Sequence, residues 1–93
     1  MKKIILVIAV AISLSGDDYM CDIYTEKWKK SNNLAVMAIE DTRNRRAIEY
    51  LNDTLEFVAT ASVECGYSDE TKKSMNSFRK SLRDKIKEVK NAL

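Results

Sequence analysis

The chain contains no histidine and no proline, and it has only two glycines and two cysteines among its 93 residues. Histidine is the commonest general base and metal ligand, so its absence argues against most enzyme classes and against a metal centre. Tight turns between strands depend on glycine and related turn residues, so a many-stranded sheet has little to be built from. The remaining composition, 45% apolar and 32% charged, predicts one small helical domain that is not an enzyme and holds no cofactor.

Residues 1–15 have the layout of a secretory signal peptide. Lys2 and Lys3 precede an apolar run over residues 4–14 in which Ser13 is the one polar residue, and the small residues Ser15 and Gly16 follow it. A membrane-spanning helix needs about 20 apolar residues, so an uncleaved anchor has less support than an export signal. We expect cleavage after Ser15, which leaves residues 16–93 as a single helical domain in the periplasm or outside the cell.

The two cysteines predict one disulfide, because an exported chain with an even cysteine count normally pairs them. A Cys21–Cys65 bond closes a loop of about 45 residues, which stabilises the fold by roughly 4 kcal/mol in the chain-entropy model. Two free thiols or a catalytic thiol have less support, since no histidine is present to activate either cysteine and the pair is not spaced as C-x-x-C.

Hydrophobic periodicity predicts a first helix over residues 20–42. Its apolar stripe consists of Met20, Ile23, Tyr24, Trp28, Leu34, Ala35 and Ala38. The weak helix formers at residues 31–33 leave open a kink or a break within this helix.

A second helix is predicted from about Arg46 to Gly66, where glycine can adopt the left-handed conformation that ends a helix. Its apolar side consists of Ala47, Ile48, Leu51, Leu55, Val58 and Cys65. The polar stretch over residues 41–46 lies midway between the two cysteines. A turn there makes the two helices an antiparallel hairpin and brings Cys21 opposite Cys65.

A third helix is predicted after Ser68, a plausible N-cap that precedes Asp69 and Glu70 in the first turn. Its apolar stripe consists of Met75, Phe78, Leu82, Ile86, Val89 and Leu93. This stripe can cover the groove of the hairpin. The expected fold is therefore all-α, a small three-helix bundle made of a disulfide-closed hairpin and a C-terminal amphipathic helix.

One flank of the third helix is basic and is a candidate partner-binding surface. It consists of Lys72, Arg79, Lys80, Arg83, Lys87 and Lys90. The simplest interpretation is a solvated surface that complements the acidic side of the second helix in the same molecule. A protein partner is the main functional interpretation, and a membrane surface has less support. Nucleic acid is not expected, because no nucleic-acid-binding motif accompanies the charges.

Aromatic side chains supply further candidates for a contact surface. Tyr50, Phe57 and Tyr67 lie off the apolar stripes and are expected to be exposed, whereas Trp28 lies on a stripe and is expected in the core. Glu49, Asp53 and Glu56 share one face of the second helix. That face is interpreted as solvated and not as an acid/base or cation site, because no chelating loop accompanies it.

Cys21 starts one predicted helix, Cys65 ends a later one, and a lysine-rich tail follows over residues 72–90. This order of features resembles the periplasmic acid-stress chaperones of the HdeA and HdeB type. That resemblance implies a bundle that exposes its apolar stripes when its carboxylates are protonated and its positive charges repel one another. The chain lacks the prolines of that family. Small exported immunity and inhibitor proteins and phage-encoded envelope regulators share the same arrangement, so no family is assigned.

The sequence therefore predicts a non-enzymatic exported binding protein, bacterial or phage-encoded, that docks on a protein of the cell envelope or a secreted protein. An inhibitor, immunity or regulatory role fits this expectation. A periplasmic acid-stress chaperone of the HdeA-like type and a peripheral membrane-surface binder are the alternatives.

Overall fold

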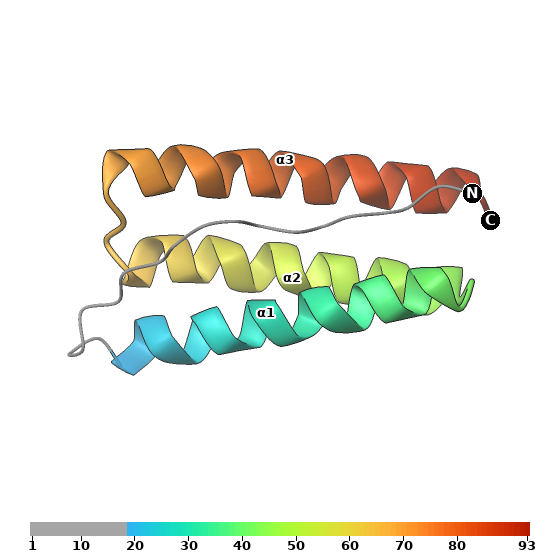
Figure 1. The fold of residues 1–93 in the computed structure, drawn as a ribbon, viewed down its shortest axis with the longest axis horizontal. Coiled ribbons are helices and arrows are strands. Elements are labelled where there is room, and N and C mark those ends of the chain that lie inside the picture. Colours follow the sequence, from blue (N-terminus) through green and yellow to red (C-terminus); the bar gives the residue numbers. More distant parts are fainter. Residues whose placement is uncertain (1–18) are drawn as a thin grey trace.

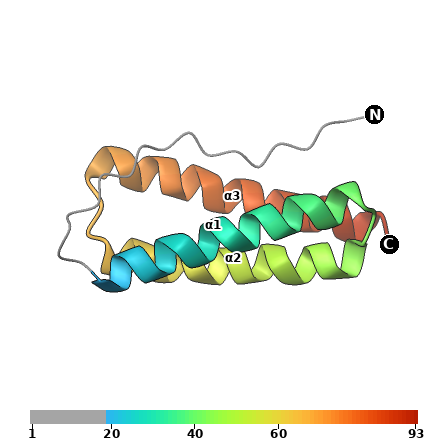
Figure 2. The ribbon, with the colours of Figure 1, turned by 60° about the horizontal axis from the view of Figure 1, so that its bottom comes forward.

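The computed structural model describes residues 19–93, which form three helices and no strand. α1 spans Tyr19–Glu40, α2 spans Asn44–Glu64 and α3 spans Asp69–Asn91. Successive helices run antiparallel and lie side by side (Figure 1), and α1 runs obliquely relative to the other two (Figure 2). The predicted small all-α three-helix bundle is confirmed. The predicted signal peptide, residues 1–15, lies outside the described residues.

α1 ends two residues earlier than its apolar pattern predicted. The backbone N–H of Arg43 donates to the carbonyl oxygen of Ala38 over 2.8 Å, and that of Thr42 donates to Ile39 over 3.0 Å. These two bonds form a Schellman motif, in which the residue after the C-cap is left-handed. Here that residue is Thr42, with a φ of 59°. A threonine rarely adopts this conformation, so no residue type marked the end of the helix in advance. α2 consequently begins at residue 44 and not near 46.

The connection from α2 to α3 follows the sequence prediction. Gly66 is left-handed, with a φ of 57°, and it ends α2 without the steric penalty that a Cβ would bring. Ser68 caps α3, because its Oγ accepts a hydrogen bond from the backbone N–H of Thr71 over 3.3 Å. Asp69 and Glu70 occupy the first turn, where negative charge favours the helix dipole.

α1 continues without a break through residues 31–33, so the break left open by its weak helix formers does not occur. Ser31 is buried, as are Ala35 and Ala38 one and two turns further along. On α2 the buried residues include Ala47 and Ala61. Small side chains let two helices approach closely, and α1 and α2 are the most extensively packed pair of the bundle. This packing along the whole helix outweighs the low helix propensity of three residues.

α3 covers the hairpin and completes one continuous core. Its backbone packs on α2 and stays further from α1. The gap to α1 is bridged by large side chains, chiefly Trp28 and Phe78, whose ring centroids lie 5.3 Å apart. The buried apolar residues of α3 are Met75, Phe78, Leu82, Ile86 and Val89, as the stripe predicted apart from Leu93, which is exposed. Met20 was also predicted on an apolar stripe but is 40% exposed, because it lies at the end of the bundle beyond the core.

Candidate functional site

The Cys21–Cys65 disulfide joins the start of α1 to the end of α2, as predicted. The two Cα atoms are 4.7 Å apart. Cys21 is buried, whereas Cys65 is half-buried. The hydroxyl of Thr25, one turn along α1 from Cys21, lies 3.9 Å from each sulfur. This part of the molecule, where the chain also passes into the α2–α3 loop, is called the disulfide end below.

Tyr67 is buried, with 9% of its surface exposed, so the expectation that it belongs to an exposed contact surface is wrong. Residue 67 lies in a loop, where a helical periodicity does not apply. The left-handed Gly66 turns the chain back over the disulfide end, and the ring of Tyr67 joins the core beside Trp28. The hydroxyl of Tyr67 and the indole N–H of Trp28 are both buried, and neither makes a hydrogen bond of good geometry.

Burial raises the pKa of the Tyr67 hydroxyl above its ordinary value of 10.0, and the nearby polar groups of Thr25 and Trp28 offset only part of that rise. The folded state therefore favours the neutral hydroxyl, and the unfolded chain releases this proton first as the pH rises. The contribution of this hydroxyl to the free energy of unfolding is fully present below pH 10.0. It is lost as the pH rises from there through the higher pKa that Tyr67 has in the folded state. Tyr67→Phe is expected to abolish this component and to change the stability at pH 7 by no more than about 1 kcal/mol.

Urea unfolding curves at pH 7 to 11 check this expectation, with Tyr19→Phe as the matched control, because Tyr19 is 74% exposed. The alkaline loss of stability should be smaller in Tyr67→Phe than in the unmodified chain and unchanged in Tyr19→Phe. An equal loss in all three proteins would show that Tyr67 does not contribute.

The residues of the basic flank of α3 differ in exposure, because one part of the flank lies next to α2. Arg79 is half-buried, whereas the other members of the flank, Lys72, Lys80, Arg83, Lys87 and Lys90, are exposed. Arg79 and Arg83 line a groove of about 400 Å³ together with Asp53 and Glu56 of α2. The acidic face of α2 and part of the basic flank thus lie next to each other in one molecule. This placement favours the interpretation in which Arg79 and Arg83 complement carboxylates of the same molecule.

The two other predicted aromatic residues, Tyr50 and Phe57, are half-buried on the side of α2 that meets α1. Phe57 packs on Tyr24, with ring centroids 6.3 Å apart. The Nζ atom of Lys27 lies 5.6 Å from the centroid of Tyr24 and 5.4 Å from that of Phe57. A cation next to two aromatic rings is a favourable arrangement. Lys27 therefore already covers the Tyr24 and Phe57 rings.

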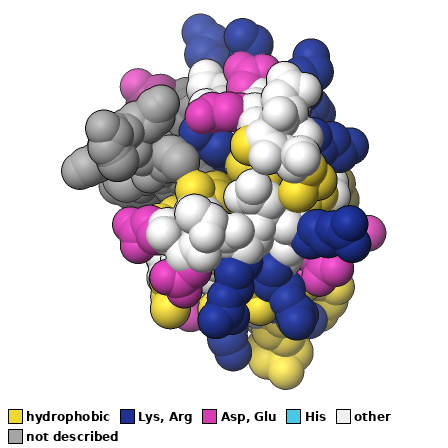
Figure 3. Space-filling view, turned by 90° about the vertical axis from the view of Figure 1, so that its right-hand side faces the viewer, with side chains coloured by type: hydrophobic (Ala, Val, Ile, Leu, Met, Phe, Trp, Pro, Cys, Tyr) yellow, Lys and Arg dark blue, Asp and Glu magenta, His cyan; other side chains and the backbone are white. Residues whose placement is uncertain are grey.

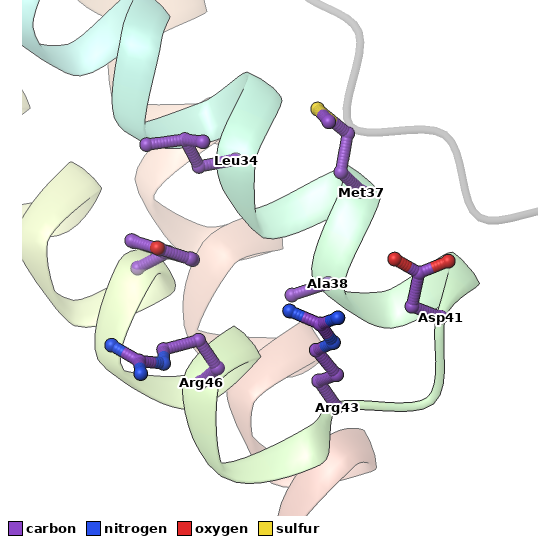
Figure 4. A pocket seen from close by; sticks show the side chains of 7 residues that line it. Leu34, Met37, Ala38, Asp41, Arg43 and Arg46 are labelled. Atoms are coloured by element: carbon purple, nitrogen blue, oxygen red, sulfur yellow. The ribbon is translucent and has the colours of Figure 1, made fainter.

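Tyr50 lines a hollow between α1 and α2, at the end of the bundle where α1 turns into α2. This hollow of about 260 Å³, called the closed-end hollow below, opens between the two helices (Figure 4). It is lined by Leu34, Met37, Ala38, Asp41, Arg43, Arg46 and Tyr50. Met37 is 58% exposed. Figure 4 shows Arg43 rising from the start of α2 towards Ala38, whereas Arg46 extends away from it.

The N-terminus of α2 at this hollow is strongly basic. Arg43 is the N-cap residue and makes no side-chain capping bond, Arg45 and Arg46 follow in the first turn, and no acidic residue lies in that turn. The positive end of the helix dipole adds to these charges. Arg46 contacts Glu49 at 3.9 Å between two exposed side chains. Within residues 19–93, Arg43 and Arg45 have no ion-pair partner. Viewed onto this end, Lys and Arg side chains gather at the top, right and bottom of the molecule, with Asp and Glu side chains between them and on the left (Figure 3).

Sequence reasoning identified Tyr50 but missed the rest of the closed-end hollow. The polar stretch over residues 41–46 was interpreted only as a turn, although its three arginines within four residues were a detectable signal. Leu34 was assigned to the core, and Met37 was not singled out. The α1–α2 turn brings these residues together, and their grouping depends on where that turn begins.

No protein-family model matches the chain, and neither a curated protein nor a solved structure matches it closely enough to indicate a relative. Among residues 19–93, no group of three or more cysteine or acidic side chains is placed to hold a metal ion. None of the three described helices has the length and apolar character needed to cross a bilayer. The fold and the two ends of the bundle are therefore the basis for a functional proposal.

Proposed function

We propose that the protein is an exported, non-enzymatic binding protein whose closed-end hollow docks on an acidic segment of another protein of the cell envelope or a secreted protein. It acts on that partner as an inhibitor, an immunity protein or a regulatory factor. The observation that carries the proposal is a hollow with apolar side chains beside the basic start of α2, where Arg43 is the N-cap residue and Arg45 and Arg46 follow in the first turn.

The arginines are the first step of the argument. Positive charges at a helix N-terminus oppose the helix dipole, typically by a few tenths of a kcal/mol each. Arg43, Arg45 and Arg46 therefore do not stabilise α2 by their charge. Arg43 and Arg45 have no ion-pair partner within residues 19–93, and Arg46 has only an exposed 3.9 Å contact with Glu49, so all three can bind an external group. A guanidinium binds a carboxylate through two parallel hydrogen bonds, which favours Asp and Glu side chains of a partner.

The hollow itself is the second step. Leu34, Met37 and the ring of Tyr50 provide apolar surface next to the arginines, and the volume of about 260 Å³ suits one or two apolar side chains. Binding energy in protein interfaces is concentrated where an apolar anchor enters a pocket surrounded by polar contacts. A small inorganic anion would leave this apolar surface in water. A peptide segment that has an apolar side chain between carboxylates satisfies both parts of the site.

Site-specific photocrosslinking in the producing cells tests the proposal. A benzoylphenylalanine at Met37 is expected to give a covalent adduct with one partner, and the linked peptide should be rich in Asp and Glu. The matched control carries the same group at Val63, which is 79% exposed near the disulfide end of α2. Arg46→Glu in the Met37 variant should reduce the adduct by about tenfold, whereas Arg46→Lys should retain most of it.

The charge reversal is a clean test because it should not unfold the chain. It removes an exposed pair with Glu49 that contributes less than about 1 kcal/mol and places a second carboxylate near Glu49. The helix dipole favours a negative charge at this position and offsets part of that repulsion. The thermal midpoint is expected to stay within a few degrees of the unmodified value. Equal adducts from positions 37 and 63, an adduct that Arg46→Glu leaves unchanged, or no adduct from position 37 would each contradict the proposal.

A further inference from the structure

The two sulfurs of the disulfide lie in different surroundings. Cys21 is 2% exposed and belongs to the first turn of α1, whereas Cys65 is half-buried and is the C-cap residue of α2. The residue after it, Gly66, is exposed, and a side chain built on its Cα would meet no atom within 4 Å. Cys65 is therefore the more accessible of the two cysteines, and open space lies beside it at Gly66.

The helix ends give the two sulfurs different chemistry as well. A thiolate at the N-terminal turn of a helix is stabilised by the dipole and by backbone N–H groups without intrahelical partners. A thiolate at a helix C-terminus faces carbonyl groups and is disfavoured. The Thr25 hydroxyl lies 3.9 Å from both sulfurs, so it can donate to a thiolate that forms at Cys21 but does not itself distinguish the two cysteines. Exchange is faster when the sulfur that leaves is the better stabilised thiolate, so Cys21 is the preferred leaving group.

We propose that Cys65 is the S-thiolation site of this protein, at which an external thiol forms a mixed disulfide. The external thiolate attacks Cys65 Sγ and forms a new S–S bond with it, while the Cys21–Cys65 bond breaks. The electron pair leaves on Cys21 Sγ, and the resulting thiolate takes a proton from water. The attacking thiol is oxidised to the disulfide level and Cys21 is reduced, so no further oxidant or reductant takes part.

The partner is defined by this chemistry as a thiolate that reaches the loop after α2. A small monothiol and the first cysteine of a Cys-x-x-Cys oxidoreductase both supply it. The same attack, run backwards, closes the bond, with Cys21 attacking a mixed disulfide held at Cys65. Cys65 is thus the attachment point both for opening the disulfide and for forming it.

Two arms of one experiment distinguish the sources. In the first, the oxidised protein is treated briefly with reduced glutathione, quenched in acid, alkylated and mapped by peptide mass spectrometry. In the second, the same protein is mixed with a thioredoxin-type reductase whose second active-site cysteine is replaced by serine, so that the covalent complex persists. In either arm, the adduct is expected at Cys65 in at least about tenfold excess over Cys21. Comparison of the two arms shows whether Cys65 reacts with a small monothiol, with the first cysteine of an oxidoreductase, or with both.

Variants at residue 25 test the role of the hydroxyl. Thr25→Val is expected to slow the opening by roughly twofold to fivefold, and Thr25→Ser should restore the rate, because it returns the donor to the leaving sulfur. Adducts divided equally between the cysteines, adducts mainly on Cys21, or no adduct in both arms would overturn the proposal. The position of the adduct is read directly from the unmodified chain, so the conclusion does not depend on the folding of any variant.

Discussion

Replacing both cysteines by alanine is expected to lower the free energy of unfolding by about 4 kcal/mol. The bond joins residues 44 positions apart and so removes a large part of the conformational freedom of the unfolded chain. The folded state loses little, because the cysteines sit at the end of the helical hairpin and α1 and α2 remain in contact along their length. For a domain of this size the loss is comparable to half or more of the total stability.

Urea unfolding followed by circular dichroism measures this loss. The same comparison on the unmodified chain with and without dithiothreitol separates the crosslink from the packing of the sulfurs, because reduction leaves both sulfur atoms in place. Reduced protein and the double alanine variant should agree within about 1 kcal/mol, and both should show a larger dependence on urea, since an open unfolded chain exposes more surface. Equal midpoints for oxidised and reduced protein would show that the bond does not stabilise the fold.

The apolar periodicity predicted the helices because burial dominates their formation here. Trp28, Leu51 and Leu82 each belong to the apolar stripe of one helix, and each is buried as the pattern predicted. The disulfide followed from two separate signals, the pairing expected of two cysteines and a polar stretch midway between them. Neither signal depends on the exact end of a helix, and for this reason the pairing was predictable although the turn was misplaced by two residues.

The errors concern residues whose surroundings are set by backbone geometry and not by periodicity. Thr42 ends α1 in a left-handed conformation that its residue type does not favour. Tyr67 enters the core because Gly66 reverses the chain, and a helical wheel has no place for a loop residue. Each outcome depends on how the helices are joined or tilted, which a one-dimensional pattern does not contain.

The same reasoning explains why the candidate site was only partly anticipated. The basic flank of α3 was visible as a charge pattern on one helix, but the closed-end hollow draws on two helices and the turn between them. The closed-end hollow and the disulfide lie at opposite ends of the bundle. The hollow is held by the short turn and its Schellman bonds, so opening the disulfide at the other end should leave the docking residues in place.

Trp28→Ala is expected to lower the free energy of unfolding by about 3 to 5 kcal/mol, because the contact between α1 and α3 depends mainly on the Trp28 side chain. Trp28 is 4% exposed and packs on Phe78, and the backbones of α1 and α3 approach each other too little to compensate for its removal. The vacated volume is therefore not refilled by a small shift of either helix. Because the indole N–H makes no hydrogen bond of good geometry, the loss should lie towards the lower end of this range.

Trp28→Phe is the matched control, since it keeps an aromatic ring against Phe78 and removes the buried N–H. It is expected to cost less than half as much as Trp28→Ala. A double-mutant cycle with Phe78→Ala should give a coupling free energy of about 0.5 to 1.5 kcal/mol, which reports the ring contact separately from the burial of each ring. Urea unfolding of the four proteins supplies the values. A loss below about 1 kcal/mol for Trp28→Ala, or additive effects of the two substitutions, would show that α3 is held by its packing on α2 alone.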